Sequence, residues 1–363
     1  MKPYAIIIPA MIMLALAAAE AKEFDFQRYF SKKWHVNAND VIVIENPIGE
    51  IQIANTEPEL GSFVVVKQRI FASFDELAKS RQMVMMVRVN DTRRPDSLIL
   101  ETQFPMHMFD KYCYPEMGGL FTSEIEGTWQ GQKMTISPRK GEKLWSDVHV
   151  EIPAGHRVII RSLAASFLVE DFHGDIDFAT NHASAMTAGD IVGNLFITTC
   201  HGGLSVSKFT GELFYDGEDS DISFCDVVKG KVNAKSTTGD IIWSAKCDSL
   251  MLLEIESLSG KIMFNGEFGK FTRLTNDEGN IRIEPTSHII DSLVATTVAG
   301  NIELTMPENY AGELLASADA GKIKHRLPNG DAKNIRTALK GQGGKIVLKS
   351  ARGAIDISLK ATK

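Results

Sequence analysis

The sequence contains few of the residue patterns that carry chemistry. Only four cysteines occur among 363 residues, and none belongs to a Cys-x-x-Cys pair or to a Cys/His metal-ligand spacing. A Gly-x-Ser-x-Gly elbow, a phosphate-binding loop and an HExxH helix are all missing. The net charge of −7 argues against a nucleic-acid partner, which would require a basic stripe. We therefore assign no catalytic, cofactor-binding or metal-ligating residue, and we expect a protein that is not an enzyme.

Long hydrophobic runs are confined to the N-terminus. An apolar run over residues 4–19 leads into Ala19-Glu20-Ala21, which is a small-x-small cleavage pattern. The sequence thus predicts a signal peptide over residues 1–21, with an uncleaved anchor as the alternative. No cysteine follows the run, so a lipoprotein is not indicated. We expect the mature chain to be exported to the periplasm, or secreted to the cell surface, and not to be an integral membrane protein.

A short repeat fills the C-terminal two thirds of the chain. A glycine, a polar residue and an aliphatic residue recur about every twenty residues, which is typical of a stacked array. The copies begin at Gly239, Gly260, Gly279, Gly300, Gly321 and Gly344. A second, weaker set lies halfway between them, so each unit of about twenty residues holds two strand-turn pieces.

Apolar residues alternate within each piece, as in Ile241 and Trp243 or in Ile262 and Phe264. This alternation indicates a half-buried strand, and the glycine fits a corner where the backbone turns or approaches a neighbour closely. We predict an all-β fold, a single-stranded parallel β-solenoid with about 20 residues per rung. An antiparallel β-sandwich is the alternative, but it gives no reason for a constant Gly-x-Ile register. The shape of the cross-section and the handedness stay open.

The mature chain is divided into an N-terminal β region, residues 22–163, and a β-solenoid repeat array, residues 164–363. The N-terminal region already carries one copy of the motif, within residues 41–54. Such rungs leave one end of the array open, and an open strand edge invites aggregation.

A short helix is expected near that open end. Ser73 and Glu76 form a capping-box pattern, which predicts a helix over about 74–83 that would cap the array. Residues 104–146 then break the strand pattern and are interpreted as a long insertion, a suitable place for specific recognition.

The insertion is rich in methionine and aromatic residues. Met106, Met108 and Cys113 together could bind a soft metal such as copper. The interpretation that we favour is an apolar segment packed on the array, with methionine filling irregular gaps.

The cysteines lie at different distances in sequence from the glycines of the repeat, so they do not stack on neighbouring rungs. We expect buried thiols, with one disulfide as the alternative that export would permit. The pairing is left open among the four residues, which are Cys113, Cys200, Cys225 and Cys247.

Two other groups of residues could carry chemistry. Carboxylates gather near corners at Asp171, Asp175, Asp190 and residues 216–221, where a pair could serve a glycosidase or hold Ca²⁺. Solvated acidic residues in turns are the simpler interpretation.

Histidines form the second group. His173, His182 and His201 could meet across rungs to bind Zn²⁺ or to transfer protons. They share no fixed offset from the repeat, so we do not assign them to a site.

The phased repeat resembles the bacterial putative-adhesin β-strand-repeat family. The segments that support this are VIVIENPIGEIQIA at residues 41–54, DVHVEIPAGHRVIIRS at 147–162 and STTGDIIWSA at 236–245. The similarity covers about residues 41–357, apart from the insertion. It implies an exported β-solenoid in envelope adhesion or envelope-stress signalling, and the family has no agreed catalytic residues to transfer.

These observations lead to one expected function and one alternative. We expect an exported, non-enzymatic β-solenoid that acts as an adhesin-like binding or structural module of the cell envelope. Its partner would be an unknown envelope protein or glycan. The alternative is a carbohydrate-active β-helix enzyme that uses surface carboxylates.

Overall fold

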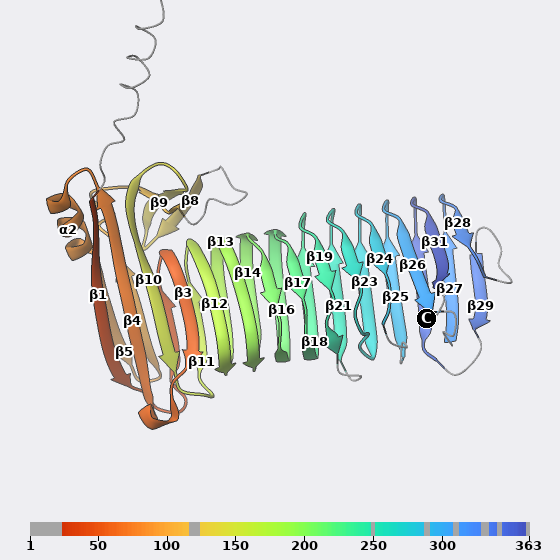
Figure 1. The fold of residues 1–363 in the computed structure, drawn as a ribbon, viewed down its shortest axis with the longest axis horizontal. Helices are drawn as coiled ribbons and strands as arrows, with labels where there is room; N and C mark the ends of the chain where they lie inside the picture. Colours follow the sequence, from red (N-terminus) through yellow and green to blue (C-terminus); the bar gives the residue numbers. More distant parts are fainter. Residues whose placement is uncertain are drawn as a thin grey trace, which may run out of the picture.

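The described part of the protein is an elongated stack of β-strands with one α-helix at its N-terminal end (Figure 1). The computed structural model describes residues 24–115, 124–247, 251–286, 291–307, 312–327, 334–339 and 343–360. The predicted signal peptide lies outside these residues. The helix is α2 (Leu77–Met86), and a short 3-10 turn, η1, spans Pro58–Leu60.

Two ladders of strands run along the long axis and face each other across the core. The first ladder, in spatial order, contains β1 (Phe24–His35), β4 (Phe63–Phe74), β10 (Glu142–Ile152), β3 (Ile48–Asn55), β12 (Ala164–His173), the second half of β13 (Asp175–Val192), β15 (Leu204–Val206), β17 (Ile222–Phe224), β19 (Ile241–Trp243), β22 (Ile262–Phe264), β24 (Ile281–Ile283), β26 (Ile302–Pro307), β31 (Ile355–Lys360) and β28 (Ile323–His325).

The second ladder contains, in spatial order, β5 (Arg88–Arg94), β6 (Ser97–Gln103), β2 (Val41–Glu45), β11 (Arg157–Arg161), the first half of β13, β14 (Leu195–His201), β16 (Phe209–Asp219), β18 (Val227–Ser236), β21 (Leu252–Ser257), β23 (Phe271–Asn276), β25 (Ser292–Thr297), β30 (Lys345–Ser350), β27 (Gly312–Ala318) and β29 (Asn334–Leu339). A short strand, β20 (Lys246–Cys247), lies between the ladders and pairs with β18.

Parallel pairing dominates the array. Neighbouring strands are parallel from β12 to β28 in the first ladder and from β11 to β27 in the second. From β14 to β28, apart from the short β20, consecutive strands of the chain alternate between the two ladders, so the chain coils with two strands per turn. The predicted β-solenoid is therefore confirmed, the β-sandwich alternative is wrong, and the cross-section is flattened.

The three positions of the repeat have separate physical roles at the corner. A Cβ placed on Gly300 would lie 1.8 Å from the carbonyl oxygen of Gly279, so only glycine fits where the rungs meet. The polar residue that follows bonds the next rung: Asp240 Oδ1 accepts the backbone N–H of Lys261 at 2.8 Å. In the same way, Asn280 Oδ1 accepts the N–H of Asn301 at 2.8 Å.

The aliphatic position of the repeat builds the core. Ile241, Ile262, Ile281 and Ile302 occupy equivalent positions on successive rungs and are buried. Two positions further on, Trp243 lies between Phe224 and Phe264, with ring centroids at 4.9 and 5.9 Å. This stacking buries a continuous apolar row that no single rung could bury alone.

The C-terminal coil departs from the expected order. β30 lies between β25 and β27, and β31 lies between β26 and β28, so the last coil in sequence is inserted before the preceding one in space. Gly353 therefore stacks on Gly300, and Gly321 stacks on Gly353. The placement of Gly344 in the same set of copies as Gly300 is wrong, because Ile346 pairs with residues of the second ladder, whereas Ile302 lies in the first.

The N-terminal part of the described chain, residues 24–163, forms a head with mixed pairing. β1–β4, β4–β10 and β5–β6 are antiparallel. α2 begins at Leu77 rather than near residue 74, and its N-cap, Glu76, makes no side-chain capping bond. The capping-box expectation fails because Ser73 belongs to β4, where it pairs with Asp25 and Lys143.

The insertion also has more regular structure than expected. Its described residues include β7 (Lys111–Cys113), β8 (Ile125–Trp129), β9 (Gln132–Ser137) and the start of β10. These strands share a second apolar cluster with α2, formed by residues such as Met83, Tyr112 and Met134. The described part of the insertion is thus packed apolar sequence, as expected, but it forms strands rather than a loop and packs mainly within the head rather than on the array.

Candidate functional site

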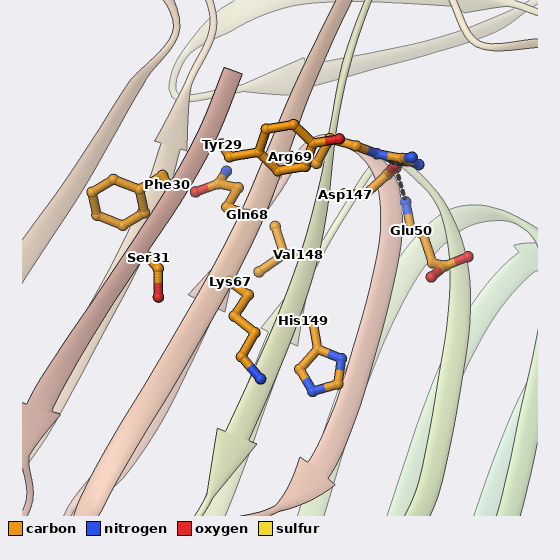
Figure 2. Close-up of a pocket in the computed structure, with 10 residues that line it drawn as sticks. All are labelled: Tyr29, Phe30, Ser31, Glu50, Lys67, Gln68, Arg69, Asp147, Val148 and His149. Carbon is orange, nitrogen blue, oxygen red and sulfur yellow. Dashed lines mark hydrogen bonds and ion pairs between the residues drawn. The ribbon is translucent and has the colours of Figure 1, made fainter. Parts of the chain in front are cut away.

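A groove on the outer surface of the head is the best-defined candidate site. It has a volume of about 590 Å³ and lies across β1, β4, β10 and β3 (Figure 2). Strand pairing sets its rows: Tyr29 lies opposite Arg69, and Arg69 lies opposite Asp147. Because side chains alternate along a strand, these residues all project from the outer face. Four segments far apart in sequence thus meet in one surface.

The charged groups of the groove hold one another in place. Arg69 donates to Asp147 Oδ2 through Nε at 3.1 Å and through Nη2 at 2.5 Å. Asp147 Oδ1 also accepts the backbone N–H of Glu50 at 3.0 Å, as Figure 2 shows. Lys67 forms an ion pair with Glu151. These contacts fix donors and acceptors on rigid strands, which lowers the cost of ordering them around a ligand.

One histidine borders the charged pairs. His149 Nδ1 lies 2.8 Å from Gln52 Oε1, and its Nε2 lies 3.5 Å from Glu151 Oε1. Burial lowers the pKa of His149, and the nearby Lys67 lowers it further against the opposing effect of Glu151. The ring is therefore favoured in its neutral form and can both donate and accept a hydrogen bond.

Aromatic surface adjoins the same groove. Tyr29 is 74% exposed, and its hydroxyl donates to Gln27 Oε1 at 2.8 Å. On the neighbouring row, Phe71 stacks on Trp145 with ring centroids 4.1 Å apart. Exposed aromatic rings beside fixed polar groups are typical of recognition surfaces.

Met106, Met108 and Cys113 of the insertion do not share one environment. Met106 packs against the second apolar cluster, Cys113 is buried and Met108 is exposed. Residues 116–123 of the insertion lie outside the described residues. Within the described part, groups of three or more His, Cys, Asp or Glu side chains suited to a metal do not occur.

The corner carboxylates mostly organise the backbone. Asp175 accepts the N–H of Asn194 at 2.9 Å, and Asp221 accepts that of Asp240 at 2.8 Å. Asp171 and Asp190 adopt positive φ angles of 50° and 51°, which aspartate tolerates better than most residues.

Other acidic residues of that group reach the surface of the array. Asp216 and Glu218 line a separate hollow beside β8. Of the acidic positions expected from the sequence, these two share a concave surface.

Two of the three histidines meet. His182 and His201 pair in register on β13 and β14, with ring centroids 6.2 Å apart. Burial, and next the charge of His201, lowers the pKa of His182 to about 4. His173 lies at the end of β12, where it pairs with Val192 instead. The three-histidine site that we considered is therefore not assembled.

The four cysteines are thiols in the structure and are not joined by disulfides. Cys113 is buried, Cys200 and Cys247 are partly buried, and Cys225 is exposed, so the expectation of burial is wrong for Cys225. Burial and the nearby Glu218 raise the pKa of Cys200, which disfavours its reactive thiolate form.

Sequence reasoning did not find the groove of the head. Its signal was present as alternating outward residues around Tyr29, Lys67 and His149. The strand pairing that brings those segments together joins residues far apart in the chain, and it follows no sequence repeat from which it could be predicted.

No helix among the described residues is long and apolar enough to cross a membrane.

Several solved structures are similar to this chain at low identity. A putative adhesin from Parabacteroides merdae ATCC 43184 is 12% identical with a TM-score of 0.35, covering 91% of this chain and 96% of that one. A putative adhesin from Parabacteroides distasonis ATCC 8503 is 12% identical with a TM-score of 0.27, covering 91% and 97%. A putative cell adhesion protein from Clostridium sporogenes ATCC 15579 is 10% identical with a TM-score of 0.19, covering 92% and 100%.

Those TM-scores are too low to support an argument about arrangement or ligand. Among curated proteins, none matches this sequence. The family described as Toastrack DUF4097 matches residues 143–358, which is more than half of the chain. That span contains nearly all the parallel rungs and every copy of the glycine motif from Gly239 onward. As its phased repeat predicted, the chain belongs to the Toastrack DUF4097 family.

Proposed function

We propose that the protein is an exported, adhesin-like binding module of the cell envelope, and that the groove of the head contacts its ligand. The observation that carries this proposal is the combination of an exposed aromatic ring, Tyr29, with immobilised ion pairs on one rigid sheet. The partner is an envelope glycan or protein. The array holds the head at one end of a stiff rod (Figure 1).

The fixed ion pairs suit binding better than turnover. A catalytic acid or base must exchange protons freely during the reaction, whereas Arg69 and Lys67 are each paired with a carboxylate. Paired charges instead supply a constant pattern of donors and acceptors, which gives specificity to a polar ligand.

Binding of the mature chain, residues 22–363, to envelope fractions and to a glycan array tests the proposal. Tyr29→Ala should weaken the binding about ten-fold or more, because exposed aromatic anchors dominate recognition surfaces. Phe271→Ala is the matched control, since Phe271 is 48% exposed on the array and far from the groove. Equal losses in both variants, or no loss in either, would count against the head as the binding surface.

Two further observations bear on the wider proposal. The mature N-terminus should be Lys22 when the protein is recovered from an extracytoplasmic fraction, and an N-terminus at Met1 would oppose export. Retained glycans should keep their length after incubation, whereas shortened glycans would favour the alternative of a carbohydrate-active enzyme.

A further inference from the structure

The groove of the head contains a histidine whose two ring nitrogens both face oxygen atoms. Nδ1 of His149 lies 2.8 Å from Oε1 of Gln52, and Nε2 lies 3.5 Å from Oε1 of Glu151. A neutral imidazole carries one N–H and can donate to only one of these oxygens, whereas the protonated ring can donate to both. The positions of Gln52 and Glu151 therefore suit the charged form of His149.

Lys67 already occupies the carboxylate that a charged His149 would need. Strand register places Lys67 of β4 opposite His149 of β10, and Figure 2 shows the two side chains next to each other. The ammonium of Lys67 and Nε2 of His149 approach the same atom, Oε1 of Glu151. A separation of 3.5 Å is at the limit of a hydrogen bond, so Lys67 is the cation that holds Oε1 while His149 is neutral.

The surroundings of His149 set the conditions under which it takes up a proton. Burial lowers the pKa of His149 most, the charge of Glu151 raises it, and the charge of Lys67 lowers it. Histidine is the side chain that ordinarily changes charge between about pH 8 and 5, so mild acid acts on the groove through His149. The other charged groups on the outer faces of β10 and its two neighbours are Arg69 of β4, Glu50 of β3 and Asp147 of β10.

A proton on His149 changes which cation holds Glu151. The imidazolium can donate a charge-assisted hydrogen bond to Oε1 of Glu151 while Nδ1 keeps its bond to Gln52. It also adds a positive charge beside the ammonium of Lys67, and like charges at close range repel. The side chain of Lys67 is 58% exposed and that of Glu151 is 17% exposed, so Lys67 is the partner that can turn toward solvent.

The charge balance of the groove then changes in favour of anions. Its outer face carries two cations and three carboxylates, which belong to Lys67, Arg69, Glu50, Asp147 and Glu151. An anionic ligand meets an excess of carboxylates while His149 is neutral. Protonation of His149 removes that excess and releases the ammonium of Lys67 into the groove, where it can pair with a negative group of the ligand.

We propose that mild acid converts the groove into a site for an acidic glycan, in which the sugars carry carboxylate groups. Protonated His149 takes Oε1 of Glu151 from Lys67, and the ammonium of Lys67 pairs with a carboxylate of the ligand. The exposed ring of Tyr29, opposite Arg69 in register, contacts the apolar face of a sugar. This inference rests on the proposed function, because it takes the groove as the binding surface, and it adds the ligand class and its control by protons.

An NMR titration of the mature chain, residues 22–363, tests the proton switch without any ligand. The ring C–H resonances of His149 are identified by their loss in His149→Gln, and they should titrate with a pKa below the usual value of histidine. Lys67→Met removes a positive neighbour and should raise the pKa of His149, whereas Glu151→Gln removes a negative neighbour and should lower it. A pKa of His149 that neither variant moves would overturn the proposed competition for Oε1.

Isothermal calorimetry at pH 7.5 and pH 5.5 tests the ligand class. Oligogalacturonate should bind about two- to five-fold more tightly at the lower pH, which is the range expected for one partly exposed ion pair. An uncharged galacto-oligosaccharide of the same length should show no such gain. His149→Gln and Lys67→Met should each abolish the gain, whereas His173→Gln should keep it, because His173 is an exposed histidine at the end of β12.

Two results of the calorimetry would overturn the proposal. An equal gain at pH 5.5 in His149→Gln and in the wild type would assign the pH dependence to other groups. Tighter binding of oligoglutamate than of oligogalacturonate at pH 5.5 would make the ligand of the acid form a peptide and not a glycan.

Tyr29→Ala separates failure of this inference from failure of the proposed function. If Tyr29→Ala weakens binding but the affinity of the wild type does not depend on pH, the groove remains the binding surface and the proton switch is wrong. If Tyr29→Ala leaves binding unchanged at both pH values, the ligand binds elsewhere, and the proposed function and this inference fail together.

Discussion

The head and the array reach a β structure by different means. In the array, parallel rungs repeat the same corner, so each rung needs only its two neighbours. In the head, long strands such as β1, β4 and β10 pair antiparallel across large sequence separations. The comparison teaches that the repeat determines the rod, whereas the groove that we propose as a binding surface lies where the repeat stops and segments far apart in sequence meet.

The largest expected effect comes from removing the inserted coil. Deletion of residues 345–363 removes β30 and β31, which join β27 and β28 to the rest of the array. Hydrogen exchange should show complete loss of protection over residues 312–325. Residues 63–74 in the head should stay protected, because an array transmits stability only between neighbours. Persistent protection at 312–325 would show that β27 and β28 are stable without the inserted coil.

A comparison of two glycines sharpens the contrast between the regions. Gly300→Ala should destabilise the array by about 4 kcal/mol or more, since its Cβ would meet backbone on the neighbouring rung at 1.8 Å. Gly61→Ala in the head should cost about 1–3 kcal/mol, because the backbone of Gly61, with φ 54° and ψ −116°, is one that residues with a Cβ disfavour, although the space around it is open. Urea unfolding followed by circular dichroism measures both. Similar costs would mean that the array can open its rungs to admit a side chain.

The array should respond to acid through His182. Its pKa of about 4 in the folded chain lies below the usual 6.5, so the unfolded chain binds more protons between these values. The effect of His182 on the free energy of unfolding is therefore absent above about pH 6.5, and protonation lowers that free energy by about 3 kcal/mol as the pH drops to about 4. Urea unfolding of the wild type and of His182→Gln at pH 7.5, 5.5 and 4 tests this. Parallel losses in the two proteins would assign the acid sensitivity to other groups.

The smallest expected effect concerns the polar residue at the corner. Asn280→Ala should destabilise the array by about 1 kcal/mol, because the N–H of Asn301 loses its acceptor. Asp240→Asn should change stability by less than about 0.5 kcal/mol, because the amide oxygen can still accept the N–H of Lys261. Urea midpoints compare the two variants directly. A larger loss in Asp240→Asn would show that charge, and not hydrogen bonding, matters at this corner.

The sequence predicted the array well because its information is local. Gly260 and Ile262 already imply close backbone approach and a buried strand, and each rung repeats that pattern. The capping-box pattern at Ser73 failed because pairing with Asp25 and Lys143 stabilises an extended chain at that position. Tertiary pairing of this kind overrides local propensity.

The candidate sites were harder to predict than the fold. Tyr29, Arg69 and Asp147 become neighbours through antiparallel pairing that no local pattern specifies. Asp216 and Glu218, which line the separate hollow beside β8, were recognised as acidic candidates. Trp129 lines the same hollow but was not recognised, because β8 and the strands that carry the acidic residues are far apart in the sequence. The resemblance of the repeat to the adhesin-like family identified the family, but that family has no agreed functional residues that could be transferred to this chain.

The inserted coil makes the order of synthesis matter. β27 and β28 leave the ribosome before the strands that will separate them from β25 and β26. β25 and β26 therefore present an open parallel edge until Lys345 and the residues after it have been synthesised. A chain interrupted before that point would keep exposed strand edges, which attract proteases and other chains. The last coil thus matters more than its position in the sequence suggests, because β27 and β28 are joined to the rest of the array only through β30 and β31.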